Sequence, residues 1–161
     1  MAKTIVFYFS ATNTTKQRAE KIASKLGADL FAIQAEKPYS AADLDWHDPN
    51  SRTSIEQHQH ASRVAIKDEL PAINNYDTVL IGFPIWWGIP PRLIADLIDR
   101  LPLNGKQLAG FATSGSSGFE RAQSYLERTV KENNADVRVL SGAVLNSDAQ
   151  MDAWLKQLNL N

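Results

Sequence analysis

The chain of 161 residues contains no cysteine. This absence excludes disulfides, thiolate metal sites and thiol redox chemistry, so any redox function has to use a bound cofactor. A charge excess of one sign is also lacking, because seventeen basic residues stand against eighteen acidic ones and the formal net charge is −1. Without a strong electrostatic field we expect neither nucleic acid nor a membrane surface as a partner. No apolar run approaches the length of a membrane span.

The N-terminal residues lead straight into an apolar segment, and no signal-peptide hydrophobic region precedes it. We therefore expect a soluble, cytoplasmic protein. The hydrophobic content of 43% and the charged content of 22% are ordinary for globular proteins. The length suits one domain, residues 1–161, with a substantial core.

Short segments rich in β-branched and aromatic residues alternate with amphipathic stretches along the chain. The predicted strands are residues 4–9, 30–33, 78–83, 108–113 and 137–140, the last extending towards Val144. The first predicted helix follows residue 15 and carries the apolar residues Ala19, Ile22, Ala23 and Leu26. The other four helices are predicted to start at Thr53-x-x-Glu56, Pro90-Pro91, Ser117-x-x-Glu120 and Ser147-x-x-Gln150. The helix that starts at Thr53 is expected to end before Pro71. Apolar strands that alternate with amphipathic helices indicate an α/β protein, whose parallel sheet has helices on both faces.

The segment between the first strand and the first helix is rich in hydroxyl groups. It reads Ser10, Ala11, Thr12, Asn13, Thr14 and Thr15. The first N–H groups of a helix have no partner within the helix, and the macrodipole adds positive charge there. Each hydrogen bond to a charged group is worth about 1.5–3 kcal/mol. The segment is thus suited to a phosphate, although Thr14-x-x-Gln17 also fits a capping box.

Two further loops follow strands that end at the same edge of the sheet. The first contains Pro84, Ile85, Trp86, Trp87 and Gly88. Adjacent tryptophans on a surface loop favour stacking on a planar ligand. We predict Trp87 as the stacking residue, because it lies farther from the strand end; one tryptophan packing inward on the following helix is the alternative.

The other loop contains Thr113, Ser114, Gly115, Ser116 and Gly118. Its glycines permit positive φ and a close approach of backbone N–H groups to a ligand. An ordinary turn would look the same in sequence.

Other constellations do not support a different function. A receiver domain needs acidic residues after the first strand and an aspartate after the third, and those places hold other residues. A serine hydrolase with Ser116 as its nucleophile would have its catalytic histidine later in the chain, but all histidines precede Ser116. His58 and His60 are two residues apart and would not face each other on a helix. We expect no catalytic residue and no metal site.

The combination of the three loops resembles the flavodoxin family. Ser10-x-Thr12-Asn13-x-Thr15 is similar to its phosphate loop, and the loops at Phe83–Gly88 and Thr113–Ser116 are similar to its two isoalloxazine loops. The resemblance implies a three-layer flavodoxin-like fold of five parallel strands in the order 2-1-3-4-5, with FMN as cofactor. Asn13 replaces the usual glycine, and we expect it to keep the turn because asparagine tolerates the left-handed region.

The resemblance leaves two functions open. One is a low-potential electron-transfer carrier that serves redox partner proteins, a reductase and an acceptor, as a monomer or weak homodimer. The other is an NAD(P)H-dependent FMN oxidoreductase of the quinone reductase type. The short chain and compact loops favour the carrier.

Overall fold

The structure is a computed structural model that describes residues 3–59, 62–67 and 69–160. Its strands are β1 (Thr4–Tyr8), β2 (Asp29–Ala32), β3 (Thr78–Pro84), β4 (Gln107–Thr113), β5 (Arg138–Val139) and β6 (Ala143–Val144). Its helices are α1 (Thr14–Leu26), α2 (Arg52–Gln57), α3 (Leu93–Arg100), α4 (Glu120–Glu132) and α5 (Asp148–Leu158). Strands and helices therefore alternate as predicted.

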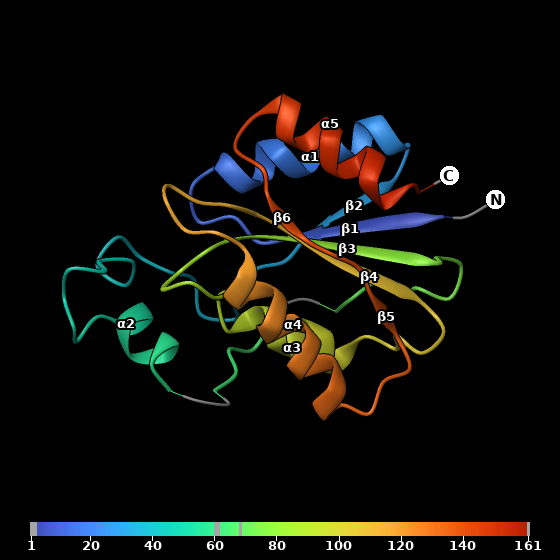
Figure 1. Ribbon diagram of the computed structural model, residues 1–161. Helices are drawn as coiled ribbons and strands as arrows, with labels where there is room; N and C mark the ends of the chain where they lie inside the picture. The colour runs from blue at the N-terminus through green and yellow to red at the C-terminus, as the bar shows by residue number, and fades with distance from the viewer. Residues whose placement is uncertain (1–2, 60–61, 68, 161) are drawn as a thin grey trace.

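The strands form one parallel sheet in the order β2-β1-β3-β4-β5, which confirms the predicted topology. Helices α1 and α5 cover one face, and α3 and α4 cover the other (Figure 1). Successive residues of a strand point to opposite faces. Val6 accordingly packs in the core beneath α1 and α5, whereas Ile5 and Phe7 pack in the core beneath α3 and α4. This burial on both faces explains why the strands are almost continuously apolar.

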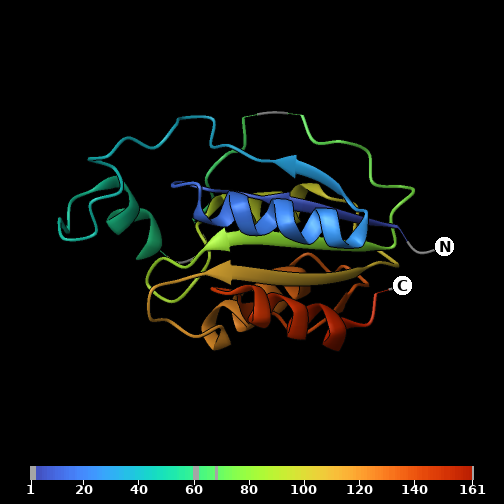
Figure 2. The same ribbon diagram turned by 90° about the horizontal axis from the view of Figure 1, so that it is seen from above.

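The carboxyl ends of the strands all lie at one side of the molecule. Figure 2 shows that α2 and the irregular chain around it extend beyond this side, while both ends of the described chain lie at the opposite side. In the described part of the chain, no helix combines the length and the apolar character needed to cross a membrane.

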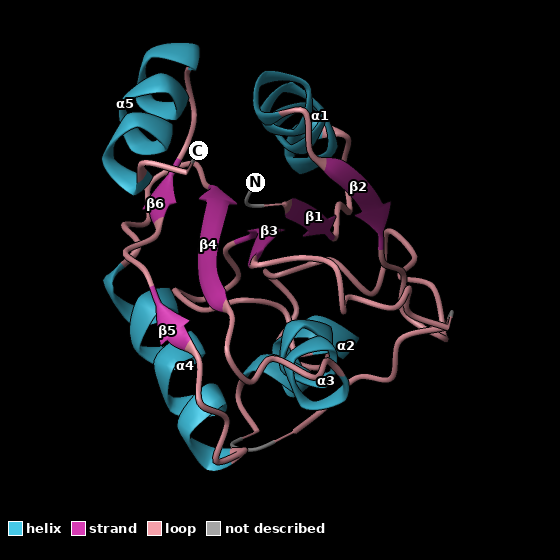
Figure 3. Cartoon of the chain, turned by 90° about the vertical axis from the view of Figure 1, so that its right-hand side faces the viewer, coloured by secondary structure: helices cyan, strands magenta, loops and turns pink. Residues whose placement is uncertain are grey.

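The last predicted strand is broken rather than continuous to Val144. Both β5 and β6 pair with β4, and residues 140–142 separate them at the sheet edge (Figure 3). Side chains bind the backbone in this gap: Gln123 donates to the Leu140 carbonyl (3.2 Å) and accepts from the Gly142 N–H (2.8 Å). The Trp154 indole donates to the carbonyl of Ser141 at 2.9 Å. These hydrogen bonds from two helices replace the ladder of a regular strand.

The prediction of a long helix from Thr53 to the residue before Pro71 was wrong. Helix α2 has six residues, and its N-cap is Ser51, whose side chain accepts from the N–H of Ser54. Ile66 pairs instead with Ala35 in an isolated antiparallel bridge. The backbone N–H and C=O groups of this segment thus find partners on the chain after β2.

The other predicted helix starts had mixed outcomes. Ser147 caps α5 as expected, with its hydroxyl accepting from the Gln150 N–H at 3.1 Å. Helix α1 begins after Asn13 and α4 after Phe119, and neither of these residues makes a side-chain capping bond. The capping boxes expected at Thr14 and at Ser117 are therefore not formed.

Candidate functional site

The three loops predicted from the sequence surround one cleft of about 630 Å³ at the carboxyl ends of the strands. It is lined by Ala11, Thr12, Leu44, Trp46, Thr53, Ile85, Trp86, Trp87, Ser114, Gly115, Ser116 and Ser117. Each loop thus contributes predicted residues to the lining. The predicted residues that do not line the cleft are Ser10, Asn13, Thr14, Thr15, Pro84, Gly88, Thr113 and Gly118. Which of these residues contact a ligand stays a prediction.

The hydroxyl loop at residues 10–15 wraps around the start of α1. The Ser10 hydroxyl accepts the N–H of Lys16 at 3.2 Å, so it satisfies one of the free donors of the helix. Asn13 forms a turn with a φ of +20° and a ψ of −12°, which lies outside the left-handed region expected for it. Thr12 and Thr14 are exposed, with their hydroxyl oxygens 3.5 Å apart. The loop therefore presents hydroxyl groups beside the N-terminus of a helix, where an anion is stabilised.

Thr15 differs from its neighbours because its side chain points inward. The residue is 2% exposed, and its hydroxyl lies 2.8 Å from that of Thr113 at the end of β4. The two hydroxyls hydrogen-bond to each other and join the first loop to the third. Thr15 therefore holds the loops in place through a buried hydrogen bond, a role that the sequence pattern did not indicate.

The tryptophan loop makes a tight turn over residues 86–89. Trp86 donates to the Ile89 carbonyl at 2.9 Å, and Ile89 donates back to Trp86 at 3.3 Å. The two central residues, Trp87 and Gly88, have φ values of +53° and +82°. Positive φ at both central positions is the type I′ geometry. It suits glycine but is strained for tryptophan, and such strain is found at functional sites.

The two tryptophans have different surroundings. The ring of Trp86 makes edge-on contacts with Phe9 and Tyr39, at centroid distances of 5.8 and 5.4 Å. It therefore packs inward, but its ring partners are Phe9 and Tyr39 rather than the following helix that the alternative named. The ring of Trp87 lies edge-on to His58 at 5.4 Å and also lines the cleft. Both tryptophans line the cleft, and stacking of Trp87 on the ligand stays a prediction.

The third loop is held by a residue that the sequence did not single out. The Asn146 side chain donates to the Ser114 carbonyl at 2.6 Å and accepts from the Ser114 N–H at 3.2 Å. The Ser114 backbone N–H and C=O thus already have a partner in Asn146. Gly115 and Gly118 do not have positive φ, so the expected left-handed conformation is absent there.

The irregular segment between β2 and α2 forms the outer wall of the cleft. Its residues Leu44 and Trp46 line the cleft, and the Trp46 side chain is largely exposed. Arg52 at the start of α2 holds the segment in place: it donates to the Lys37 carbonyl at 2.7 Å and to Glu56 at 2.7 Å. The sequence could not show that Trp46 reaches the cleft.

Tyr39 lies at the base of the same wall. Its hydroxyl donates to a carboxylate oxygen of Glu56 at 2.7 Å, and the Arg52 guanidinium lies 3.9 Å from its ring centroid. Burial, followed by the hydrogen bond to Glu56 and the charge of that carboxylate, raises the pKa of Tyr39 above its ordinary value. Tyr39 therefore stays neutral and anchors the segment.

The described residues contain no group of three or more His, Asp or Glu side chains suited to a metal ion. His58 lies at the end of α2, with its Nδ1 2.6 Å from the Ser54 carbonyl. His60, the other histidine weighed as a ligand, lies outside the described residues.

Comparisons with known proteins agree with this geometry. The sequence model of a family described as Flavodoxin matches residues 3–158. A protein of Bacteroides eggerthii, provisionally named a flavoprotein, is 39% identical with a TM-score of 0.92, and the match covers 100% of both chains. A flavoprotein of Lactobacillus acidophilus in complex with FMN is 25% identical with a TM-score of 0.69, and the match covers 96% of this chain and 99% of that one. No protein with a curated description matches the chain.

Proposed function

The chain belongs to the flavodoxin family, and we propose that it acts as a low-potential electron-transfer carrier between redox partner proteins. Its cofactor is FMN. Bound FMN supplies a ring that takes up and releases electrons, so the protein has to bind and orient this ring and tune its surroundings.

The residues of the cleft and of the adjoining hydroxyl loop fit this cofactor. The hydroxyls of Thr12 and Thr14 and the N-terminus of α1 suit the phosphate. Trp87 offers a flat face for the ring, and the loop at Ser114–Ser117 offers a polar rim. Among the residues that the structure describes, no cationic side chain lines the cleft, so we propose that hydroxyl and N–H donors alone hold the phosphate.

The observation that best supports the carrier is the peptide between Trp87 and Gly88. Arg121 donates to the Trp87 carbonyl at 3.0 Å. In a trans peptide the N–H points opposite to the C=O, so the N–H of Gly88 points away from Arg121. Gly88 has a φ of +82°, where this peptide is able to turn at little steric cost. We propose that it offers the flavin ring a hydrogen bond that differs between redox states, which a one-electron carrier needs.

A second function is favoured by the space beside the cleft. A neighbouring hollow of about 540 Å³ shares Trp46 and Trp87 with it. A nicotinamide ring or a quinone would have room there. This observation favours an NAD(P)H-dependent FMN oxidoreductase of the quinone reductase type as the alternative.

Stepwise anaerobic reduction of the FMN-loaded protein separates the two functions. For a carrier we expect two one-electron stages, seen as two successive sets of isosbestic points in the absorption spectrum. In Gly88→Ala, an added Cβ would lie 2.6 Å from the Arg121 guanidinium and would displace it from the Trp87 carbonyl. We therefore expect this substitution to disturb the peptide and to merge the two stages. Gly105→Ala is the matched control, since Gly105 has the same φ of +82° and nothing within 4 Å of the added Cβ. A single two-electron stage, with rapid NAD(P)H oxidation by a quinone, would contradict the carrier.

A further inference from the structure

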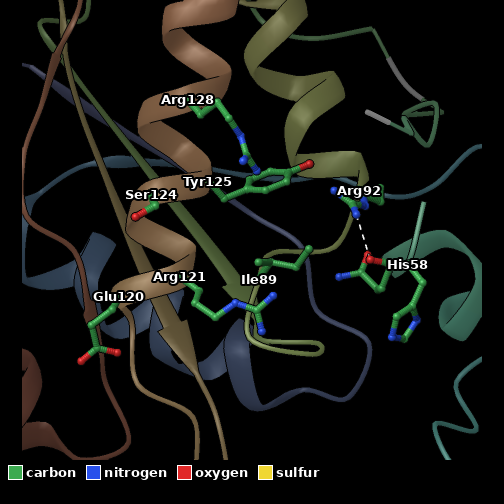
Figure 4. A pocket seen from close by; sticks show the side chains of 9 residues that line it. His58, Ile89, Arg92, Glu120, Arg121, Ser124, Tyr125 and Arg128 are labelled. Atoms are coloured by element: carbon green, nitrogen blue, oxygen red, sulfur yellow. Dashed lines mark hydrogen bonds between the residues drawn. The ribbon is translucent and has the colours of Figure 1, made fainter. Parts of the chain in front are cut away.

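A second cavity, of about 460 Å³, lies beside the tryptophan loop between α2, α3 and α4. We call it the arginine pocket, because Arg92, Arg121 and Arg128 line it together with Gln57, Ile89 and Tyr125 (Figure 4). It shares no lining residue with the cleft assigned to FMN. It is therefore a separate cavity, which the proposed function uses only through the hydrogen bond of Arg121 to the Trp87 carbonyl.

The pocket carries an excess of positive charge. Among its described lining residues the only carboxylate is that of Glu120, which points away from Arg92 and Arg128 in Figure 4. Within the described ranges, no carboxylate forms an ion pair with any of the three arginines. Guanidinium groups without carboxylate partners that gather in a cavity are suited to an anionic ligand.

The arginines are positioned by the fold. Arg92 is 5% exposed and donates to the carbonyls of Glu56 and Gln57, at 3.1 and 2.8 Å, where α2 ends. Arg121 and Arg128 are seven residues apart on α4, on the same face of the helix as Tyr125. The cavity thus has one buried cation at its wall and two exposed cations along one helix.

Two buried polar atoms in the pocket have no partner among the described residues. They are the Tyr125 hydroxyl and the Gln57 Oε1, in residues that are 4% and 5% exposed. The Gln57 amide nitrogen donates to the carbonyls of Trp86 and Pro90, which orients the oxygen as a free acceptor. Unpaired buried polar atoms are rare in native proteins. A ligand with both acceptor oxygens and a hydroxyl donor would satisfy both.

We propose that the arginine pocket binds the diphosphate group of a nucleotide. A diphosphate offers several acceptor oxygens to Arg121 and Arg128, which a single carboxylate does not. The ribose hydroxyls would donate the hydrogen bond that the Gln57 Oε1 lacks. The cavity volume exceeds what a lone phosphate would fill.

The pocket is joined to the tryptophan loop at several points, and Arg121 is the lining residue that reaches the peptide between Trp87 and Gly88. Arg121 lines the pocket and also donates to the Trp87 carbonyl. A diphosphate that hydrogen-bonds to Arg121 therefore changes the surroundings of the peptide between Trp87 and Gly88. This coupling to the flavin rests on the proposed function, whereas diphosphate binding itself does not.

Calorimetric titration of the FMN-loaded protein with ADP, inorganic phosphate and adenosine tests the proposal. Loading with FMN first keeps the probes out of the other cleft. We expect ADP to bind at least tenfold more tightly than adenosine. Tighter binding of ADP than of inorganic phosphate supports the nucleotide diphosphate, whereas equal binding of ADP and inorganic phosphate would overturn it.

Three variants and a control locate the binding. Arg121→Gln and Arg128→Gln should each weaken ADP at least tenfold, while Arg138→Gln, an exposed arginine on β5, should leave it unchanged. Tyr125→Phe should weaken ADP without loss of thermal stability, because the hydroxyl has no protein partner to lose. The flavin absorbance of each variant reports FMN binding separately, so failure of the proposed function would be seen there. Adenosine binding equal to ADP, no ADP binding at millimolar concentration, or equal effects of all three arginine variants would overturn the proposal.

Discussion

The hydroxyl groups of Thr15 and Thr113 hydrogen-bond to each other at 2.8 Å beneath the candidate site. Thr15 lies in the first turn of α1, and Thr113 is the last residue of β4. The bond therefore ties together two loops that are 98 residues apart in the sequence. Both residues are buried, so water does not replace either partner.

The energetic coupling of this pair is a first prediction. Thr15→Val leaves the buried Thr113 hydroxyl without a partner and should lower the free energy of unfolding by about 1–3 kcal/mol. Thr113→Val should do the same. The double variant should lose clearly less than the sum, because both polar groups are then gone. Urea unfolding of the FMN-free proteins measures the three losses; strictly additive losses would contradict the pairing.

Thr12 should act on the ligand rather than on the fold. Its side chain is exposed and lines the cleft, so Thr12→Val should leave the unfolding transition unchanged. FMN affinity should fall by about 1.5–3 kcal/mol if the hydroxyl bonds the phosphate. Riboflavin lacks the phosphate and is the matched control ligand. Fluorescence titration measures both, and equal weakening of the two ligands would rule out a phosphate contact.

Trp87 and Trp86 should respond differently to substitution. Trp87→Asn removes the ring but keeps a residue that tolerates positive φ, so the fold should not lose stability. FMN affinity should fall by at least about 0.5–1.5 kcal/mol, and the emission of bound flavin should rise. Trp86→Ala should instead lower the melting temperature, because its ring packs against Phe9 and Tyr39. Unchanged flavin emission in the Trp87 variant would assign the stacking to another residue.

Tyr39 should make stability depend on alkaline pH. Its pKa is raised in the folded state, first by burial and then by Glu56. The tyrosine of the unfolded chain ionises near pH 10. Stability linked to Tyr39 is thus complete below pH 10 and is lost as the pH rises further towards the folded pKa. Between pH 9 and 11.5 the wild type should lose more unfolding free energy than Tyr39→Phe. Parallel losses in the two proteins would show that Tyr39 ionises freely.

The fold could largely be predicted from the sequence because its strands are buried on both faces. Their apolar runs are hard to confuse with other elements, and the predicted order of strands is correct. The segment after Thr53 was predicted wrongly because its apolar residues are sparse. Ile66 satisfies its burial by pairing with Ala35, a contact between distant residues that no local pattern reveals.

The candidate site was predictable to the extent that it is built from loops after strands. The convergence of the three loops follows from the parallel sheet. The side chains that hold those loops could not be predicted, because Asn146 and Arg52 hydrogen-bond to backbone groups that are distant in the sequence. The arginine pocket left one signal, the helical spacing of Arg121, Tyr125 and Arg128, but Arg92 joins them only through the tertiary structure.

The break between β5 and β6 has a consequence for self-association. An intact edge strand presents a row of free N–H and C=O groups. A strand of another chain can pair with this row, and such pairing leads to aggregation. Here Gln123 and Trp154 bind the backbone groups of residues 140–142 from within the molecule. An incoming strand would find no continuous row to pair with. The interruption therefore protects this side of the sheet against fibril growth, with no charged or proline residue needed in the gap.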